Sequence, residues 1–296
     1  MGKRYDAVII GGGHNGLVCA FYLARAGYRV RILERRAIVG GAAVTEEFHP
    51  GFRNSTASYT VSLLHPRIIR DMRLIDQGYK VIERPVSNFL PLPDDQYLIL
   101  GGGIARTQAE FAKFSPRDAD ALPAYYASLE TVANVIRDLV LTCPPNVGDG
   151  MTMMLDALRQ GRHVAALTIE QQRDVLDLFT KSARGFLDSW FESDPVKAAF
   201  GFDAVVGNYA SPDTPGSAYV LLHHVFGEVN GKKGAWGHVV GGMGSITQAM
   251  ARVVQAMGVE VSLEAPVARV LVDGDKAVGV RMESGEEVMA NRVIAN

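Results

Sequence analysis

A short apolar segment near the amino end of the chain predicts a buried parallel strand. Residues 7–10 read AVII, and a continuous apolar run bounded by turn residues is typical of a strand covered on both faces. Residues 17–24 then place apolar side chains at helical spacing, and Gly27 stands where that helix should end. A second strand is expected at residues 29–33. The chain therefore begins with a βαβ unit.

Three more short strands are predicted near the carboxyl end. They are expected at residues 267–272, 277–281 and 287–290. Asp273-Gly274 and Ser284-Gly285 supply tight turns between them, as in an antiparallel β-meander. Residues 291–295 then predict a return to the parallel sheet.

The pattern between about residue 60 and residue 240 is mostly helical. Ser115-Pro116 and Asp194-Pro195 each resemble an N-cap followed by Pro at the first helical position, and residues 122–141 carry apolar side chains at helical spacing. A small sheet is expected from residues 79–83, 89–90 and 97–100. Residues 144–150 favour a flexible connection. This part is interpreted as an inserted α+β module.

The loop after the first strand carries the pattern G-x-G-x-x-G at Gly11, Gly13 and Gly16. In dinucleotide-binding βαβ units, these glycines permit a tight turn, a close approach to a pyrophosphate and close packing of the helix on the sheet. The helix N-terminus adds free N–H groups and a partial positive charge. Glu34, 23 residues after Gly11, ends the second strand, where its carboxylate accepts hydrogen bonds from ribose hydroxyls. These features predict dinucleotide binding.

Other residues near the loop complete the predicted site. His14 and Asn15 occupy the variable positions of the pattern, and Arg35 follows Glu34. We expect the three to flank the cofactor, with His14 covering it and not acting as a catalyst. Gly40-Gly41 follows soon after the acidic residue and is expected to support the phosphates or the ribityl chain. A further loop, residues 241–244, is interpreted as packing the helix at 246–257, and the alternative is a second phosphate-binding loop.

The pattern by itself does not distinguish FAD from NAD, because both contain ADP. Three features favour FAD: the motif begins the chain, a second glycine pair follows the acidic residue, and a β-meander returns to the sheet. The fold class is therefore predicted as α/β, with a Rossmann-like FAD-binding domain, a parallel sheet and a β-meander. We expect this domain at residues 1–60 and 235–296. An inserted α+β substrate domain is expected at residues 61–234.

The same motifs resemble a known family. Gly11–Gly16 with Glu34, residues 40–47 and residues 241–244 are similar to the phytoene-desaturase-like flavoproteins of the amine-oxidase superfamily. One subgroup of that family has sequence segments similar to residues 190–193, 211–217, 220–225 and 234–237 of this chain. The resemblance implies bound FAD, oxidoreductase activity and a discontinuous FAD domain. It also implies that the backbone of Val267 contacts the adenine.

Two departures from the family limit what the resemblance implies. Many members carry Arg where Ala42 stands here, so the role of that Arg is not transferred. Relatives also continue beyond the position of Asn296, while Val293-Ile294-Ala295 has the pattern of a core strand. We therefore expect the chain to be the N-terminal portion of a longer enzyme. This portion would lack part of the flavin-ring site.

Composition excludes several other classes of protein. The chain has 30 Lys and Arg against 32 Asp and Glu, with a net charge of -2, so a nucleic-acid partner is not expected. It has no run of 18 apolar residues and no signal- or transit-peptide composition. Cys19 and Cys143 are far apart, which disfavours dithiol chemistry and a zinc site. We expect a cytoplasmic location if the source is bacterial, which is taken as the default, and a mitochondrial location if it is eukaryotic.

The catalytic residues are not identified by any motif, because in flavoenzymes the cofactor carries the redox chemistry. His223-His224 is interpreted as structural, with acid–base catalysis as the alternative. Residues 151–158 and 220–226 are interpreted as core, the alternatives being an apolar tunnel or contact with a membrane surface. The predicted function is an FAD-dependent oxidoreductase acting on a small, apolar molecule. The alternatives are a flavin-bound regulator or scaffold, and an NAD(P)-dependent dehydrogenase.

Overall fold

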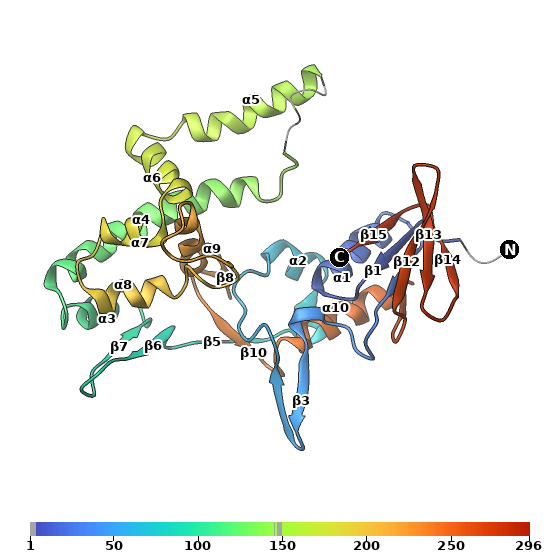
Figure 1. The fold of residues 1–296 in the computed structure, drawn as a ribbon, viewed down its shortest axis with the longest axis horizontal. Helices are drawn as coiled ribbons and strands as arrows, with labels where there is room; N and C mark the ends of the chain where they lie inside the picture. Colours follow the sequence, from blue (N-terminus) through green and yellow to red (C-terminus); the bar gives the residue numbers. More distant parts are fainter. Residues whose placement is uncertain (1–3, 145, 147–149) are drawn as a thin grey trace. The chain divides into compact units, whose positions relative to one another are not determined.

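A computed structural model describes residues 4–144, 146 and 150–296 (Figure 1). The chain divides into two compact units, Met1–Glu83 with Trp236–Asn296, and Arg84–Ala235. Residues 61–83, which the sequence pattern assigned to the inserted domain, therefore lie in the first unit. They do so because Val61 bridges Gly237 and a strand at 81–83 pairs with one at 237–239. Within the connection expected at 144–150, residues 145 and 147–149 lie outside the described residues.

The first unit is built on a four-stranded parallel sheet (Figure 1). Strands β1 (Ala7–Ile10) and β2 (Val30–Leu33) are joined by helix α1 (His14–Arg25). Strands β11 (Glu260–Ser262) and β15 (Val293–Ala295) complete the order β11-β2-β1-β15. The predicted βαβ unit and the return strand are both present, and the Rossmann-like fold is confirmed.

Helices and an antiparallel β-meander pack against this sheet. Helix α10 (Gly244–Ala256) packs against α1 and β11. The antiparallel meander of β12 (Val267–Asp273), β13 (Lys276–Met282) and β14 (Glu287–Met289) shares a core with the sheet. That core consists of Tyr5, Val8, Leu33, Ala265, Val280, Met282, Val288 and Ala290. The predicted β-meander is therefore confirmed.

The remaining elements of the first unit follow Glu34. They are η1 (Gly41–Ala43), the hairpin of β3 (Thr45–His49) and β4 (Phe52–Ser55), α2 (Pro66–Asp71), η2 (Leu74–Gln77), β5 (Val81–Glu83) and β10 (Gly237–Val239). Strand β5 pairs with β10 and not with the strands near residues 89 and 97. The predicted sheet of three segments is therefore wrong for residues 79–83, because their partner is about 150 residues away in the sequence.

The second unit is mainly helical (Figure 1). Its strands are β6 (Asn88–Pro91), β7 (Tyr97–Leu100), β8 (Glu228–Val229) and β9 (Lys232–Lys233). Its helices are α3 (Ile104–Phe111), α4 (Pro116–Leu139), α5 (Met151–Ala165), α6 (Ile169–Thr180), α7 (Ala183–Asp188), α8 (Asp194–Gly201), η4 (Ser217–Leu222) and α9 (His223–Phe226). Strands β6 and β7 form the expected hairpin.

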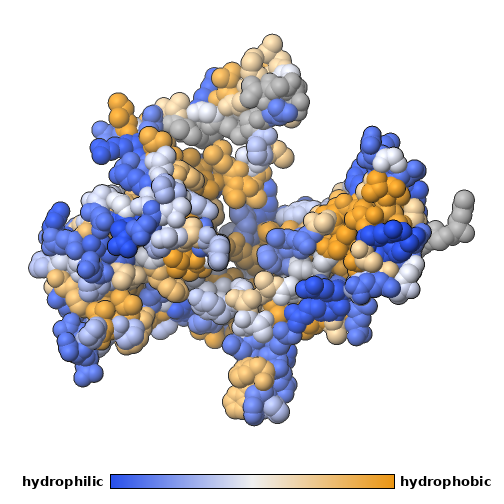
Figure 2. All heavy atoms as spheres, in the orientation of Figure 1, coloured by the Kyte–Doolittle hydropathy of each residue, from blue (hydrophilic) through white to orange (hydrophobic). Residues whose placement is uncertain are grey.

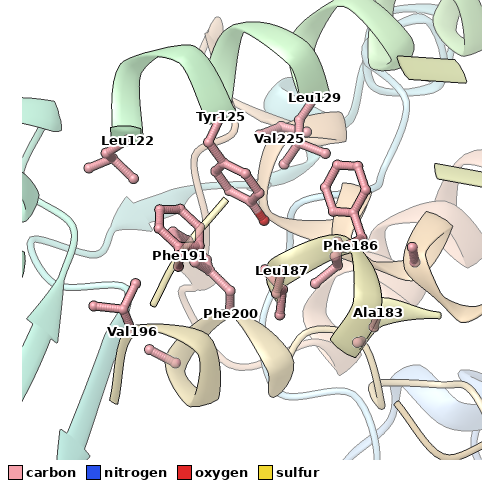
Figure 3. Packing of buried hydrophobic residues seen from close by; sticks show 14 of the residues in the cluster. Leu122, Tyr125, Leu129, Ala183, Phe186, Leu187, Phe191, Val196, Phe200 and Val225 are labelled. Carbon is pink, nitrogen blue, oxygen red and sulfur yellow. The ribbon is translucent and has the colours of Figure 1, made fainter. Parts of the chain in front are cut away.

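Aromatic and aliphatic side chains together fill the core of the second unit (Figure 3). The ring of Tyr125 lies 4.9 Å from the rings of both Phe191 and Phe200, measured between centroids. Leu221, Leu222 and Val225 also belong to this core, as the core interpretation of residues 220–226 predicts. Edge-on and tilted aromatic pairs of this kind add to the stabilisation from burial.

Helix α5 does not fit the core interpretation of residues 151–158. Met151, Leu155 and Leu158 are all more than half exposed, and apolar side chains reach the surface over α5 (Figure 2). The core interpretation of residues 151–158 is therefore wrong for these side chains. Among the helices within residues 4–144, 146 and 150–296, none has the length and apolar character needed to cross a membrane.

A buried carboxylate in the first turn of α4 holds the chain segment that precedes α8. Ser115 caps this helix by accepting a hydrogen bond from the Asp118 amide (3.1 Å). The two carboxylate oxygens of Asp118 accept from the amides of Glu192 and Ser193, each at 2.9 Å. Helix α8 begins at Asp194 with Ser193 as its N-cap, one residue earlier than expected. The chain before α8 is placed by Asp118, which itself is fully buried.

Asp118→Asn is expected to lower the free energy of unfolding of the second unit by about 1–3 kcal/mol, because its side-chain NH₂ would face a buried backbone donor. Urea unfolding followed by circular dichroism measures the loss. Asp120→Asn, on an exposed residue of the same helix, is the matched control and should change little. Equal stability of the two variants would contradict this role of Asp118.

Candidate functional site

The loop after β1 forms an open cradle at the start of α1. Gly11 has φ +104°, a conformation that favours glycine, and its amide donates to the Leu33 carbonyl (2.9 Å). Gly13 is the N-cap of α1 and offers no capping side chain. The first hydrogen bond of the helix runs from the Leu17 amide to the Gly13 carbonyl (3.0 Å). The amides of the first turn therefore have no capping side chain, and free amides at a helix N-terminus are suited to binding an anion.

Close packing requires glycine at position 16 and leaves little room for a side chain at position 12. A Cβ on Gly16 would lie 2.3 Å from the carbonyl oxygen of Gly11, which no side chain tolerates. A Cβ on Gly12 would lie 3.1 Å from atoms of both Glu34 and Val39. The predicted residues Gly11, Gly13 and Gly16 are therefore brought together. Gly12 was missed by the motif, although the run of three glycines was a signal for it.

Glu34 lies buried beside this loop, with 6% of its surface exposed. Its Oε2 accepts from the Gly12 amide (2.7 Å) and its Oε1 from the Arg36 amide (2.9 Å). Its own amide donates to the Ser262 carbonyl (2.9 Å), which ties it to β11. A carboxylate has about four acceptor sites, so both oxygens retain capacity for ribose hydroxyls.

The second glycine pair forms a wall of the same cradle. The Gly40 amide donates to the Gly12 carbonyl (2.9 Å), and a Cβ on Gly41 would lie 3.2 Å from the Cα of Gly13. Both residues have positive φ, +143° and +55°. Gly40-Gly41 thus contacts the glycine loop directly. Ala42, which stands where the family often has Arg, is exposed beside it.

The other predicted residues lie on the elements that border the cradle. His14 and Asn15 are in the first turn of α1, and Arg35 is exposed after Glu34. Desolvation beside the loop lowers the pKa of His14, so its ring is neutral at pH 7 and offers an N–H donor instead of a charge. Val267 is the first residue of β12, two residues after Ala265, whose amide donates to the Glu34 carbonyl (2.9 Å).

The loop before α10 is occupied by protein groups. The Gly244 amide donates to Thr45 Oγ1 (2.9 Å), and the Met243 amide donates to Ser55 Oγ (3.0 Å). A Cβ on Gly244 would lie 2.6 Å from the Thr45 amide nitrogen. These contacts support the interpretation of residues 241–244 as a packing loop, because the amides that a phosphate would need are already bonded.

His224, the second residue of the histidine pair, belongs to a buried polar network of the second unit. His224 Nδ1 lies 3.0 Å from Asp203 Oδ2, and its Nε2 lies 3.3 Å from the Tyr125 hydroxyl. Tyr125 is fully buried, and burial raises the pKa of its hydroxyl well above the ordinary value. A substrate cannot reach that hydroxyl, which supports the structural interpretation. Asp203 and Tyr125 were missed because no sequence motif joins them to His224.

Metal chemistry has no visible site in the part of the chain that the structure describes. Among residues 4–144, 146 and 150–296, no group of three His, Cys, Asp or Glu side chains could hold a metal ion.

Comparison with known proteins relates the whole chain to flavoproteins. The model of the family described as flavin containing amine oxidoreductase matches residues 16–296. Pyridine nucleotide-disulfide oxidoreductase domain-containing protein 2 of Rattus norvegicus is 39% identical over 311 residues, covering 99% of this chain and 53% of that protein. Prolycopene isomerase 2 of an Oncidium hybrid cultivar is 25% identical over 304 residues, covering 99% and 48%.

The fold is also found among solved structures. A redesigned putrescine oxidase matches with a TM-score of 0.63 and 19% identity, covering 99% of this chain and 57% of that one. The chain thus spans about half the length of the curated relatives it matches.

Gly16→Ala is expected to abolish flavin binding, because the added methyl group would force α1 away from Gly11 and move the helix amides out of position. Flavin content after purification measures the effect. Gly161→Ala, in an α5 position with open space, is the control and should retain the flavin content of the wild type. A Gly16→Ala chain that holds flavin normally would show that close packing is not needed.

Glu34→Gln is expected to weaken FAD binding by about tenfold or more. The glutamine NH₂ group would face the amide of Gly12 or Arg36, which both donate to Glu34, and the side chain would have one acceptor oxygen fewer. Titration of the chain with FAD, followed by quenching of flavin fluorescence, gives the dissociation constant. Glu47→Gln, on the exposed β3–β4 hairpin, makes the same chemical change elsewhere. Equal affinities of the two variants would contradict the assignment of Glu34.

Proposed function

The chain belongs to the flavin-containing amine oxidoreductase family, and from this premise we propose that it acts as an FAD-dependent oxidoreductase on a small, apolar molecule. FAD is the cofactor of that family. The activity is proposed for the protein as a whole, since the chain spans about half the length of its relatives.

The observation that carries the proposal is the cradle of Gly11, Gly13 and Gly16 beside the buried Glu34. Its backbone approaches closely at the points where a Cβ would clash, and its helix amides are free of a capping side chain. These residues fit the ADP half of FAD: the first-turn amides would hold the pyrophosphate, and Glu34 would accept from the ribose hydroxyls.

The remaining parts of the cradle would position the cofactor. Gly40-Gly41 would line the path of the phosphates or the ribityl chain, and the Val267 backbone would lie at the adenine. His14, neutral at pH 7, would cover the cofactor without adding charge. When bound, FAD supplies the capacity to accept a hydride or electrons, while this chain binds and orients it.

The substrate class is proposed from a relative. Prolycopene isomerase, which matches 99% of this chain, is named for a hydrocarbon. The likeness to putrescine oxidase, at 19% identity, concerns the fold and does not support an amine substrate. An apolar substrate also agrees with the exposed apolar side chains of α5, which support peripheral contact with a membrane surface. A cytoplasmic or mitochondrial location stays a prediction.

Two other functions remain to be separated from this one by experiment. A flavin-bound regulator or scaffold would keep its FAD without reducing it. An NAD(P)-dependent dehydrogenase would bind nicotinamide nucleotide instead of flavin, and the family match supports flavin against this alternative.

Anaerobic mixing of the FAD-loaded protein with candidate donors tests the proposal. We expect a carotenoid or other polyene hydrocarbon, delivered in detergent, to bleach the oxidised-flavin absorbance or to be recovered as an isomer, and putrescine to do neither. Dithionite serves as the control that the flavin is reducible. Reduction by putrescine alone would contradict the apolar substrate, and reduction by dithionite alone, with a stable protein partner, would favour the scaffold.

A further inference from the structure

Asn296 lies at the same edge of the sheet as the glycine loop. Ala295 is in register with Ile10, and the Asn296 amide donates to the Ile10 carbonyl (3.1 Å). Because β1 and β15 are parallel, their carboxyl ends meet at one edge. Asn296 therefore stands level with Gly11, on the side of β1 opposite Glu34 and β2.

This position is the point where the strand order reverses. From β1 the sheet continues through β2 to β11 on one side, while β15 adjoins β1 on the other. In open parallel sheets, ligands bind in the crevice outside the carboxyl ends of the strands at such a reversal. The two sides of the crevice here are the glycine loop after β1 and Asn296 after β15.

The side chain of Asn296 is directed over all three glycines of the motif. Its Nδ2 lies 3.3 Å from the positions that a Cβ would take on Gly13 and on Gly16, and 3.8 Å from that on Gly11. A side-chain amide thus faces the surface on which a pyrophosphate would rest. It arrives from a segment about 280 residues further along the chain.

We propose that Asn296 is a further binding residue for the pyrophosphate of FAD, an inference that rests on the proposed function of the cradle. Its NH₂ group, which lies beside the first turn of α1, donates a hydrogen bond to a phosphate oxygen. The side chain carries two donors and no charge, and hydrogen bonds to an ionised acceptor are stronger than neutral ones. A carboxylate at this position would repel the same phosphate.

The test exchanges that donor for a nearly isosteric acceptor. Asn296→Asp is expected to weaken the binding of FAD and of ADP by about tenfold or more, because a hydrogen bond is replaced by repulsion. Binding of adenosine, which has no phosphate, is expected to change by less than about twofold. Calorimetric titration with each of the three ligands gives these affinities without relying on enzyme activity.

Asn134→Asp is the matched control. Asn134 is exposed on α4, and its Oδ1 accepts from Arg137 Nη1 (2.9 Å) and from Lys233 Nζ (3.2 Å), contacts that Asp preserves. The variant makes the same change in charge at a residue of the second unit, which contributes nothing to the cradle. It should bind FAD, ADP and adenosine with wild-type affinity, and thermal unfolding should show both variants folded.

The outcomes separate this inference from the proposed function. A wild-type chain that binds FAD, with an Asn296→Asp variant that binds FAD and ADP equally well, overturns the inference and leaves the proposed function intact. An equal loss for adenosine and ADP also overturns it, since the effect would not be at the phosphates. A wild-type chain that binds neither FAD nor ADP removes the proposed function, and this inference with it.

Discussion

The close approach of helix α1 to the end of strand β1 is the contact on which the site depends. The position of a Cβ on Gly16 lies 2.3 Å from the Gly11 carbonyl oxygen, so the helix reaches this distance only with glycine there. The first-turn amides are thereby held beside Glu34, whose carboxylate bonds the Gly12 and Arg36 amides. These hydrogen bonds within the protein hold the loop and the start of α1 in one arrangement, and a loop held in this way lowers the entropic cost of binding a cofactor.

Much of this unit follows from local sequence signals. Strand β1 occupies the predicted residues 7–10, α1 ends before Gly27, and the three meander strands fall within a few residues of their predicted positions. Each of these elements is specified by a short apolar run, a turn pair or a glycine, and each pairs with a neighbour in the chain or in the βαβ unit. The glycine motif was predictable for the same reason, since its spacing encodes the turn.

Contacts between distant segments were not predictable in this way. Strand β5 pairs with β10, and Asn296 meets the glycine loop, only after the chain has folded back over more than 150 residues. The buried set of Asp203, His224 and Tyr125 is likewise assembled from three separate elements of the second unit. The exposure of the apolar side chains of α5 was also not predictable from their pattern. Periodicity shows which side chains share a face of a helix, but it does not show whether another element covers that face.

The central claim is that the cradle of Gly11, Gly13, Gly16 and Glu34 holds FAD. The most direct measurement is a visible absorption spectrum of the purified protein, followed by acid release and identification of the cofactor. We predict an oxidised-flavin spectrum, with FAD as the released compound. A colourless protein that gains no flavin on incubation with FAD, but binds a nicotinamide nucleotide, would contradict the account.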